Sequence, residues 1–336
     1  MRTTSLMVQN LCVPCGCRCR YCLLSWDGEI VGVPWEAGVE FARKIIAEAK
    51  AARPELNFSF SFGYCMEHPR LPEAIHLLRE IGSPQAGFLQ CDGLRIRDEE
   101  GCARFCAMLA EEDVKELNFT FYGLLAYHDR FAGRKGDFEF LLRLMRAASR
   151  AGLKISAGIP LTKENIDQTE EMIGVLRGAR CDSIRLFIPH EEGRGKALAP
   201  LRLEADDLRR LSPGSRALLS EKVYKTESAW ITGNTYEEET ERSLILSLRR
   251  DNLERLRTMR AQAVIEEIEC LDERYYAAFP TFAELAREYG DPRGAKLYRQ
   301  RDLFYHYRQR YARDHRIDVY DVCDERQSGS RRYGHI

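Results

Sequence analysis

Five cysteines stand within eleven residues near the start of the chain, at Cys12, Cys15, Cys17, Cys19 and Cys22. Thiolates this close together repel one another unless a metal ion or an iron–sulfur cluster takes up their negative charge. Disulfide pairing among them is a poor alternative, because cysteines so near in sequence cannot easily reach the Cα separation and dihedral angle that the bond requires. The segment therefore indicates a metal or iron–sulfur site in a reducing compartment.

Three ligand sets can be drawn from these cysteines. Cys12, Cys15, Cys19 and Cys22 form two Cys-x2-Cys pairs, as in a structural zinc site, although the gap between the pairs is far shorter than zinc sites usually have. A ferredoxin-type run does not match the spacing. The third set is Cys15-x3-Cys19-x2-Cys22, with the aromatic Tyr21 directly before the last cysteine. This set resembles the signature of the radical S-adenosylmethionine (SAM) superfamily.

The resemblance implies a definite chemistry. In that superfamily three cysteines hold three irons of a [4Fe–4S] cluster and leave the fourth iron open for SAM, whereas a cluster that only carries electrons is normally closed by four ligands. Cys15, Cys19 and Cys22 would be the metal ligands, and Cys12 and Cys17 would be spare. An electron donor of the flavodoxin or ferredoxin type would supply one electron. Reductive cleavage of SAM would then give a 5′-deoxyadenosyl radical that abstracts hydrogen from a substrate.

Composition narrows the class of protein. The chain has 336 residues, of which 44% are hydrophobic and 31% charged, as is usual for a soluble globular protein. Its formal net charge of −1 offers no overall basic field for nucleic acid, so a nucleic-acid partner is not expected. No apolar run approaches the roughly 20 residues that a membrane helix needs. We also find no secretory signal, and therefore expect a cytoplasmic protein without a membrane partner.

Strands and helices alternate over residues 1–200. Short apolar runs rich in β-branched and aromatic residues are followed by segments of helical period. The regular βαβ order favours a parallel sheet with helices outside, curled into a barrel. We therefore expect an α/β fold with a partial (β/α)6 TIM-like barrel, whose chemistry lies at the C-terminal strand ends, where the cysteines also lie. The predicted strands are 5–11, 56–62, 86–90, 116–121, 153–159 and 183–188, and the predicted helices are 35–52, 71–81, 98–110, 137–151 and 165–177.

After this alternation stops, residues 201–336 predict a mostly helical C-terminal extension. Helical patterns cover 253–270, 281–289 and 297–314, and a short strand is predicted at 243–248. The spacing of Leu303, Tyr307 and Tyr311 places them on one face of the last helix, which we expect to face the core. We expect the extension to close the barrel and to line the side where substrate binds.

The resemblance continues where the second predicted strand ends, at Gly63, Tyr64, Cys65, Met66 and Glu67. This segment is similar to the Ser-Gly-Gly-Glu-Pro segment of the superfamily, with Gly63 in the place of the second glycine. Tyr64 then replaces the glutamate that usually receives the amino group of SAM. The resemblance implies that Glu67, or Tyr64 itself, contacts the SAM ammonium, and Glu67 is the stronger candidate because it carries charge.

Further matches follow in order along the chain. The run Gln90–Cys91–Asp92–Gly93 is similar to the segment after the third strand, and Thr120 keeps the hydroxyl of a serine in the fourth. Asn165 corresponds to an asparagine that commonly lies near the SAM ribose. Tyr21, Gly63, Tyr64, Glu67, Thr120, Asn165 and Arg185 are thus the candidate cofactor-binding residues.

Arg185 and His128 each allow two interpretations. The charge of Arg185 within a strand must meet something polar. Its side chain could hold the SAM carboxylate or a substrate anion on the inner side, or it could form an outward bridge to a helix. For His128 and the neighbouring Asp129, we expect a structural pair rather than catalysis.

The substrate is not revealed by any motif. An anionic small molecule or a peptide is compatible with the sequence, and the arginine-rich C-terminal region mildly favours an anion. The alternative from another class is a non-catalytic protein that binds zinc or an iron–sulfur cluster through the paired cysteines.

Overall fold

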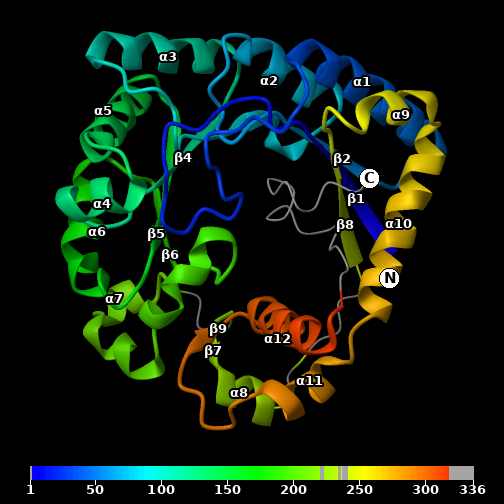
Figure 1. Ribbon diagram of the computed structural model, residues 1–336. Helices are drawn as coiled ribbons and strands as arrows, with labels where there is room; N and C mark the ends of the chain where they lie inside the picture. Colours follow the sequence, from blue (N-terminus) through cyan, green and yellow to red (C-terminus); the bar gives the residue numbers. More distant parts are fainter. Residues whose placement is uncertain (1, 220–222, 234–235, 237–240, 318–336) are drawn as a thin grey trace.

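The computed structural model describes residues 2–219, 223–233, 236 and 241–317. In this part of the chain, parallel strands form the inner wall of a partial barrel, and their helices lie on the outside (Figure 1). One sheet has the strand order β2-β1-β8, and the other has the order β3-β4-β5-β6. The strands are β1 (Arg2–Gln9), β2 (Asn57–Ser61), β3 (Phe88–Gln90), β4 (Glu116–Thr120), β5 (Lys154–Pro160), β6 (Ser183–Phe187) and β8 (Glu241–Ser247).

The outer helices follow the strands as the alternation predicts, so the α/β partial barrel is confirmed. One further helix, α4, was not predicted and begins directly after the turn that follows β4. The helices are α1 (Trp35–Ala52), α2 (Leu71–Glu80), α3 (Glu99–Glu111), α4 (Leu125–Ala132), α5 (Asp137–Arg150) and α6 (Thr169–Gly178). Short 3-10 helices are η1 (Pro84–Gly87), η2 (Ile166–Gln168), η3 (Gly193–Leu201) and η4 (Ala205–Arg210).

The strands have two different faces. In β1, Leu6 and Val8 are fully buried in the core that the outer helices share, and Ser5 and Gln9 alternate with them on the inner face. The inner positions of β1, β2 and β8 in register with Ser5 and Gln9 are polar and uncharged: Asn57, Ser61, Ser243 and Ser247. Between them lie Met7, Ser59 and Ile245, so this half of the inner wall offers hydroxyl, amide and apolar groups rather than charges.

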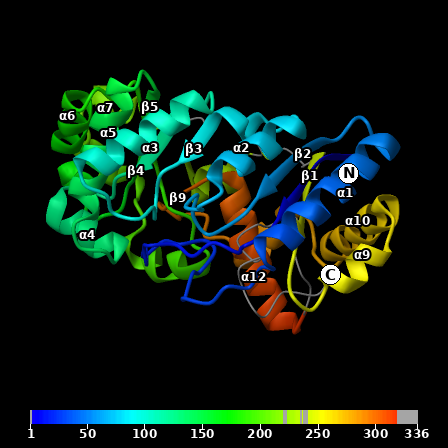
Figure 2. The same cartoon turned by 90° about the horizontal axis from the view of Figure 1, so that it is seen from above.

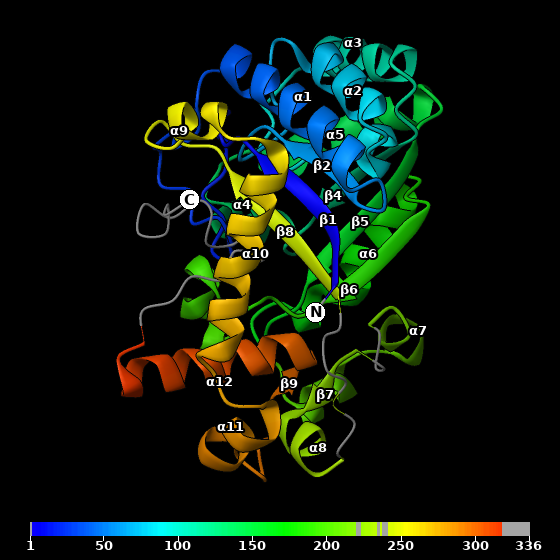
Figure 3. The ribbon, with the colours of Figure 1, turned by 90° about the vertical axis from the view of Figure 1, so that its right-hand side faces the viewer.

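β8 joins the barrel from the segment after residue 200. It pairs in parallel with β1 along its whole length, from the Arg2–Glu241 pair to the Gln9–Ser247 pair. Figure 3 shows β8 beside β1, with α10 packed alongside. The predicted strand at 243–248 is thus present, and its position extends the barrel wall beyond the six strands expected. The division of the chain into domains at residue 200 stays a prediction.

The rest of the C-terminal segment is mostly helical. One predicted helix, 253–270, is in fact two helices separated by extended backbone at Met259 and Arg260. The break is held from α1, where Glu48 accepts a hydrogen bond from the Ala261 amide at 3.0 Å. The elements are α7 (Pro213–Arg216), α8 (Glu227–Thr232), α9 (Leu253–Thr258), α10 (Ala261–Ala277), α11 (Phe282–Tyr289), α12 (Gln300–His315), and the antiparallel strands β7 (Lys225–Thr226) and β9 (Leu297–Tyr298).

A second apolar core lies between α8, α11 and α12. Leu303 and Tyr307 are fully buried in it, and the partly buried Tyr311 packs against it, so the predicted inward face of the last helix is present. Figures 1 and 2 place α12 on the side of the ring between the β6 edge and the β8 edge. Within the described residues, no helix is long and apolar enough to cross a membrane.

Candidate functional site

The cysteines lie in the loop 10–34, which leaves the C-terminal end of β1 and leads to α1. We call this segment the cysteine loop. It is hydrogen-bonded to the exits of other strands, because the Tyr64 amide donates to the Val13 carbonyl at 2.9 Å and the Gly16 amide to the Gly93 carbonyl at 2.8 Å. The Arg18 amide donates to the last residue of α4 at 2.7 Å. The loop is therefore fixed where the chemistry of a parallel barrel is expected.

The three cysteines of the predicted ligand set, Cys15, Cys19 and Cys22, are all half-buried. Cys15 Sγ accepts a hydrogen bond from the Cys17 amide at 3.4 Å, and Cys19 Sγ accepts one from the Tyr122 hydroxyl at 3.1 Å. Such donors favour the thiolate form that binds iron. The Cys22 amide donates to the Cys19 carbonyl at 3.2 Å, which turns the chain between these two residues.

The two other cysteines of the loop also make contacts, and the Cys17 thiol lies within hydrogen-bonding reach of the sulfurs of Cys15 and Cys19. Cys12 Sγ donates to the Phe62 carbonyl at 3.1 Å, and the buried Cys17 Sγ lies 3.7 Å from a carboxylate oxygen of Asp137. In the part of the chain that the structure describes, no three cysteine sulfurs lie within 4.8 Å of one another. A single tetrahedral zinc ion would hold its sulfurs about 4 Å apart, given Zn–S bonds of about 2.3 Å. The described cysteines are thus not gathered as ligands of one zinc ion, and the ligand set of Cys15, Cys19 and Cys22 stays a prediction.

Tyr21 packs its ring inside an aromatic cluster on the barrel side of the loop. The ring centroid lies 5.5 Å from that of Tyr122, 6.0 Å from Phe131 and 6.3 Å from Phe187. Burial, followed by the charge of Asp92, raises the pKa of the Tyr21 hydroxyl well above its usual value. Tyr21, which stands between the last two cysteines of the loop in sequence, is therefore neutral, and its ring packs in this cluster; its contact with SAM stays a prediction.

Thr120 is bound to a carboxylate that motif matching did not single out as a site residue. Its amide and hydroxyl donate to the two oxygens of Asp92, at 2.9 and 2.6 Å, and Gln90 also donates to this carboxylate. Burial raises the pKa of Asp92 to about 7, against the opposing effect of the Thr120 hydrogen bonds. An acid poised near neutral pH at a strand end is a functional candidate. The Asp-Gly sequence at the end of the third strand was the signal that could have found it.

Gly63 and Tyr64 support the cysteine loop from β2. A Cβ atom on Gly63 would lie 2.4 Å from Val13 Cβ, so only glycine allows this approach. The Tyr64 ring lies 4.4 Å from the ring of the buried Trp26, whose indole nitrogen donates to the Cys15 carbonyl at 2.8 Å. Burial, with a smaller effect of nearby acidic charge, raises the pKa of Tyr64 to about 12. Trp26 is a supporting residue that the sequence motifs did not reveal.

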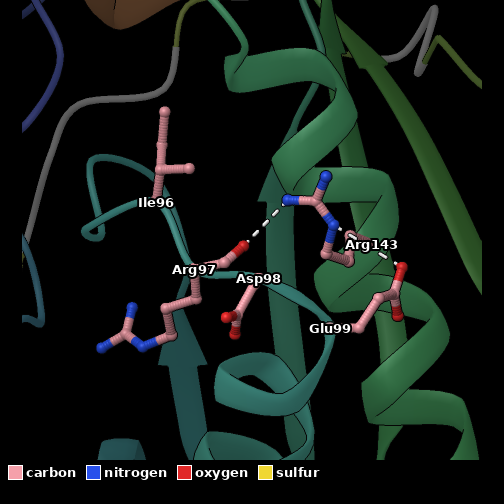
Figure 4. A pocket seen from close by; sticks show the side chains of 5 residues that line it. All are labelled: Ile96, Arg97, Asp98, Glu99 and Arg143. Carbon is pink, nitrogen blue, oxygen red and sulfur yellow. Dashed lines mark hydrogen bonds and ion pairs between the residues drawn. The ribbon is translucent and has the colours of Figure 1, made fainter.

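Glu67 forms an ion pair with Arg97. Its oxygens accept from the Arg97 guanidinium at 2.7 and 3.0 Å, and one of them also accepts from the Arg95 amide at 2.9 Å. A carboxylate has about four lone-pair positions, so about one remains for another donor. Figure 4 shows the neighbouring surface, an open pocket of about 440 Å³ in which the Arg97 carbonyl accepts from Arg143. The contact of Glu67 with the SAM ammonium stays a prediction.

Asn165 uses its whole side chain within the protein. Its Oδ1 accepts from the amide and the hydroxyl of Thr162, at 2.7 and 3.1 Å, and its Nδ2 donates to the Tyr122 and Pro160 carbonyls, at 2.6 and 2.7 Å. An asparagine amide has no further donor or acceptor position. Asn165 therefore ties the exits of β4 and β5 together. Its contact with the SAM ribose stays a prediction that this hydrogen bonding does not favour.

Arg185 lies on the inner face of β6. It pairs with Gly158, which in turn pairs with Thr120, whereas the neighbouring Leu186 is buried in the core on the helix side. The guanidinium lies 5.6 Å from the Phe187 ring centroid and makes no ion pair with a described carboxylate. Of the two open interpretations, the inward one is present, so a cation that pairs with no carboxylate among the described residues faces the inside of the barrel.

His128 and Asp129 do not pair with each other, so that expectation was wrong. His128 Nε2 lies 3.1 Å from an Asp137 oxygen, and Asp129 instead accepts from the Gly136 and Phe138 amides at 2.6 and 3.0 Å. The cause is geometric, because successive residues of a helix point in different directions. Both side chains are nevertheless structural, as expected.

The comparisons with known proteins agree with this geometry. The family model described as the radical SAM superfamily matches residues 11–176, which include the cysteine loop and the strands up to β5. This match confirms the resemblance to the radical SAM superfamily. No curated protein sequence matches it.

Solved structures with a similar fold include several radical SAM proteins. Native anSMEcpe with bound AdoMet is 13% identical, with 93% of this chain and 98% of that chain covered and a TM-score of 0.50. Streptococcus suis SuiB bound to precursor peptide SuiA is 14% identical, with coverage of 74% and 49% and a TM-score of 0.47. HemN from Escherichia coli, described as a coproporphyrinogen III oxidase, is 13% identical, with coverage of 74% and 63% and a TM-score of 0.40. The chain thus spans about half the length of the SuiB structure, and at these identities the likeness concerns the fold.

The superfamily match implies that a [4Fe–4S] cluster and SAM are the cofactors. The residues present fit the cluster. Three half-buried cysteines lie on one fixed loop, two of their sulfurs accept hydrogen bonds, and a Cβ on Gly93 would lie only 2.2 Å from Cys15 Sγ. The Cys15 sulfur thus lies close to the backbone of Gly93, where a side chain would take up its space.

Proposed function

We propose that Cys15, Cys19 and Cys22 hold the cluster and that this enzyme generates a radical from SAM to abstract hydrogen from a substrate inside the barrel. When bound, the cluster and SAM together supply one-electron cleavage of the sulfonium, which leaves methionine and a carbon radical. The observation that carries the proposal is the loop itself, which presents three cysteines at the C-terminal end of β1, two of them with sulfurs that accept hydrogen bonds. A soluble electron donor of the flavodoxin or ferredoxin type would be the partner that reduces it.

The inner wall supplies the binding groups. The Arg185 guanidinium is placed to hold a carboxylate, either that of SAM or that of an anionic substrate. Asp92, Thr120 and Tyr21 form a hydrogen-bonded group beside it, and the face of β1, β2 and β8 adds uncharged hydroxyls and amides. This combination suits a polar substrate, either a small molecule or a peptide.

The proposal is tested by cleavage of SAM. Protein purified without oxygen and reduced with dithionite should release methionine and 5′-deoxyadenosine from SAM, slowly even when no substrate is added. A variant with Cys15→Ala serves as the control for cleavage by free iron. The proposal would be contradicted by zinc in place of iron, or by protein with a complete cluster that does not cleave SAM.

Glu67→Gln tests the expected ammonium contact. Removing a carboxylate that bonds a charged group should weaken SAM binding by about 1–3 kcal/mol, measured by titration calorimetry with anaerobic protein. Arg97→Met is the matched control, because it breaks the same ion pair, keeps an apolar side chain against Phe105 and leaves the carboxylate in place. Equal losses of SAM affinity in both variants would mean that Glu67 serves only to hold Arg97.

A further inference from the structure

The segment 189–195, which follows β6, approaches the cysteine loop closely. Gly193 has a φ of +53°, and a Cβ there would lie 2.5 Å from the Cys22 carbonyl oxygen. At Gly195 a Cβ would lie 2.2 Å from the His190 carbonyl oxygen. Real Cβ atoms do not come this near to backbone, so Gly193 is required for the approach to the loop, and Gly195 is required for the turn within the segment itself. The Gly-Arg-Gly sequence thus places a single side chain, Arg194, against the cysteine loop.

Arg194 binds the cysteine loop at three points. Its amide donates to the Cys22 carbonyl at 3.1 Å, its Nε donates to the Cys19 carbonyl at 3.0 Å, and one terminal nitrogen donates to the Trp26 carbonyl at 2.8 Å. A guanidinium has several N–H donors spread over a plane and can donate to separate carbonyls in this way, whereas the donors of a lysine ammonium all lie on one nitrogen. The second terminal nitrogen is buried and has no hydrogen-bond partner among the described residues. One donor of Arg194 therefore remains available beside two proposed cluster ligands.

Residues that follow in the sequence hold the segment 189–195, which carries Arg194, in place. The buried Arg202 donates to the Pro189 carbonyl at 2.9 Å, and His190 Nδ1 lies 2.5 Å from a carboxylate oxygen of Asp302 on α12. Arg299 also donates to Asp302, at 3.1 Å. Because Arg202 and Asp302 are almost fully buried, these contacts exclude water and keep the segment rigid. Arg194 therefore lies on a segment that buried hydrogen bonds hold in place.

We propose that Arg194 is a positioning residue for the iron–sulfur cluster. It fixes the turn that contains Cys19 and Cys22, and it places a positive charge and one free donor next to the cluster site. Net charge and hydrogen bonding around a cluster set its reduction potential, and a nearby cation favours the reduced, more negative state. The proposal rests on the ligand set of Cys15, Cys19 and Cys22.

Three variants test this role: Arg194→Gln, Arg194→Lys and, as the matched control, Arg20→Gln. Arg20 lies on the same loop, but its guanidinium pairs with Glu164 rather than with loop carbonyls. Circular dichroism first confirms that each variant folds. The measurements are the rate of iron loss to a chelator and the midpoint potential of the reconstituted cluster, followed by electron paramagnetic resonance.

Arg194→Gln should lose iron about 10–100-fold faster, which is the usual effect of removing a residue that orients metal ligands. Its midpoint potential should also become more negative. Arg194→Lys should restore the potential but not the slow iron loss, because it returns the charge without the fork. Arg20→Gln should match the unmodified enzyme in both measurements.

Two results would overturn the proposal. One is an Arg194→Gln enzyme with unchanged potential and iron loss. The other is an equal shift in Arg20→Gln, which would show that only net charge matters. Should Arg194→Gln not fold, Arg194→Lys alone still decides, because iron loss at the unmodified rate contradicts the proposal. Failure of the ligand set itself would look different, since the cluster would then survive substitution of Cys15, Cys19 or Cys22 in the presence of Arg194.

Discussion

Alanine at Cys15, Cys19 or Cys22 is expected to abolish the [4Fe–4S] cluster, whereas alanine at Cys12 or Cys17 should leave it in place. Each of the first three thiolates would hold a different iron, so a site with two remaining ligands cannot keep the cluster. The spare cysteines have other contacts, with a backbone carbonyl and a buried carboxylate. Iron and sulfide content and the visible absorbance of anaerobically reconstituted protein are the measurements.

The outcome separates the two ligand sets drawn from the sequence. A cluster that is lost in Cys12→Ala but retained in Cys15→Ala would contradict the set proposed here. Tyr122→Phe is a milder change at Cys19, because it removes the 3.1 Å hydrogen bond to the sulfur and keeps all three cysteines. This change should weaken the cluster without abolishing it.

Gly93→Ala is expected to lose most of the cluster although the protein still folds. Gly93 has a φ of +78°, and a Cβ there would lie 2.2 Å from Cys15 Sγ and 3.2 Å from Cys65 Cβ. In the apoprotein the Cys15 side chain can rotate away. As a cluster ligand it cannot rotate without leaving its iron, so iron affinity should fall by about 10–100-fold. Iron content after reconstitution under limiting iron measures the effect.

Gly152→Ala is the matched control. Gly152 has nearly the same φ, +76°, but no atom lies within 4 Å of the added methyl group. Both variants should therefore lose about 1–2 kcal/mol of unfolding free energy through backbone strain, measured by urea denaturation of the apoprotein. Only Gly93→Ala should lose iron. Equal iron content in the two variants would show that the close approach of Gly93 to Cys15 does not constrain the cluster.

Local sequence pattern predicts the chemistry and most of the barrel. The spacing of Cys15, Cys19 and Cys22 can be read directly, because ligands on one short loop need no information about distant residues. The strands up to β6 could be predicted because the apolar pattern of each strand or helix involves only residues that are near one another in the sequence. The same reasoning found the buried face of α12 with Leu303 and Tyr307.

The partners of individual polar side chains depend on tertiary structure. Glu67 pairs with Arg97, and Asn165 bonds the exits of two strands, although both were predicted to contact SAM. Hydrogen-bond partners far apart in sequence leave no periodic signal, so these contacts could not be predicted. Asp92 stood within a quoted motif, yet its bond to Thr120 and its raised pKa arise only when β3 and β4 lie side by side.

The sequence by itself indicated the radical SAM superfamily, through a cysteine spacing and a strand–helix alternation that are both local. Only the tertiary structure decided that β8 completes the wall beside β1, that Arg185 faces inward and that Arg194 binds the cysteine loop. These facts share one physical reason. Each arrangement brings together segments that are far apart in the sequence. Burial and hydrogen bonding stabilise such contacts only when the whole barrel has formed.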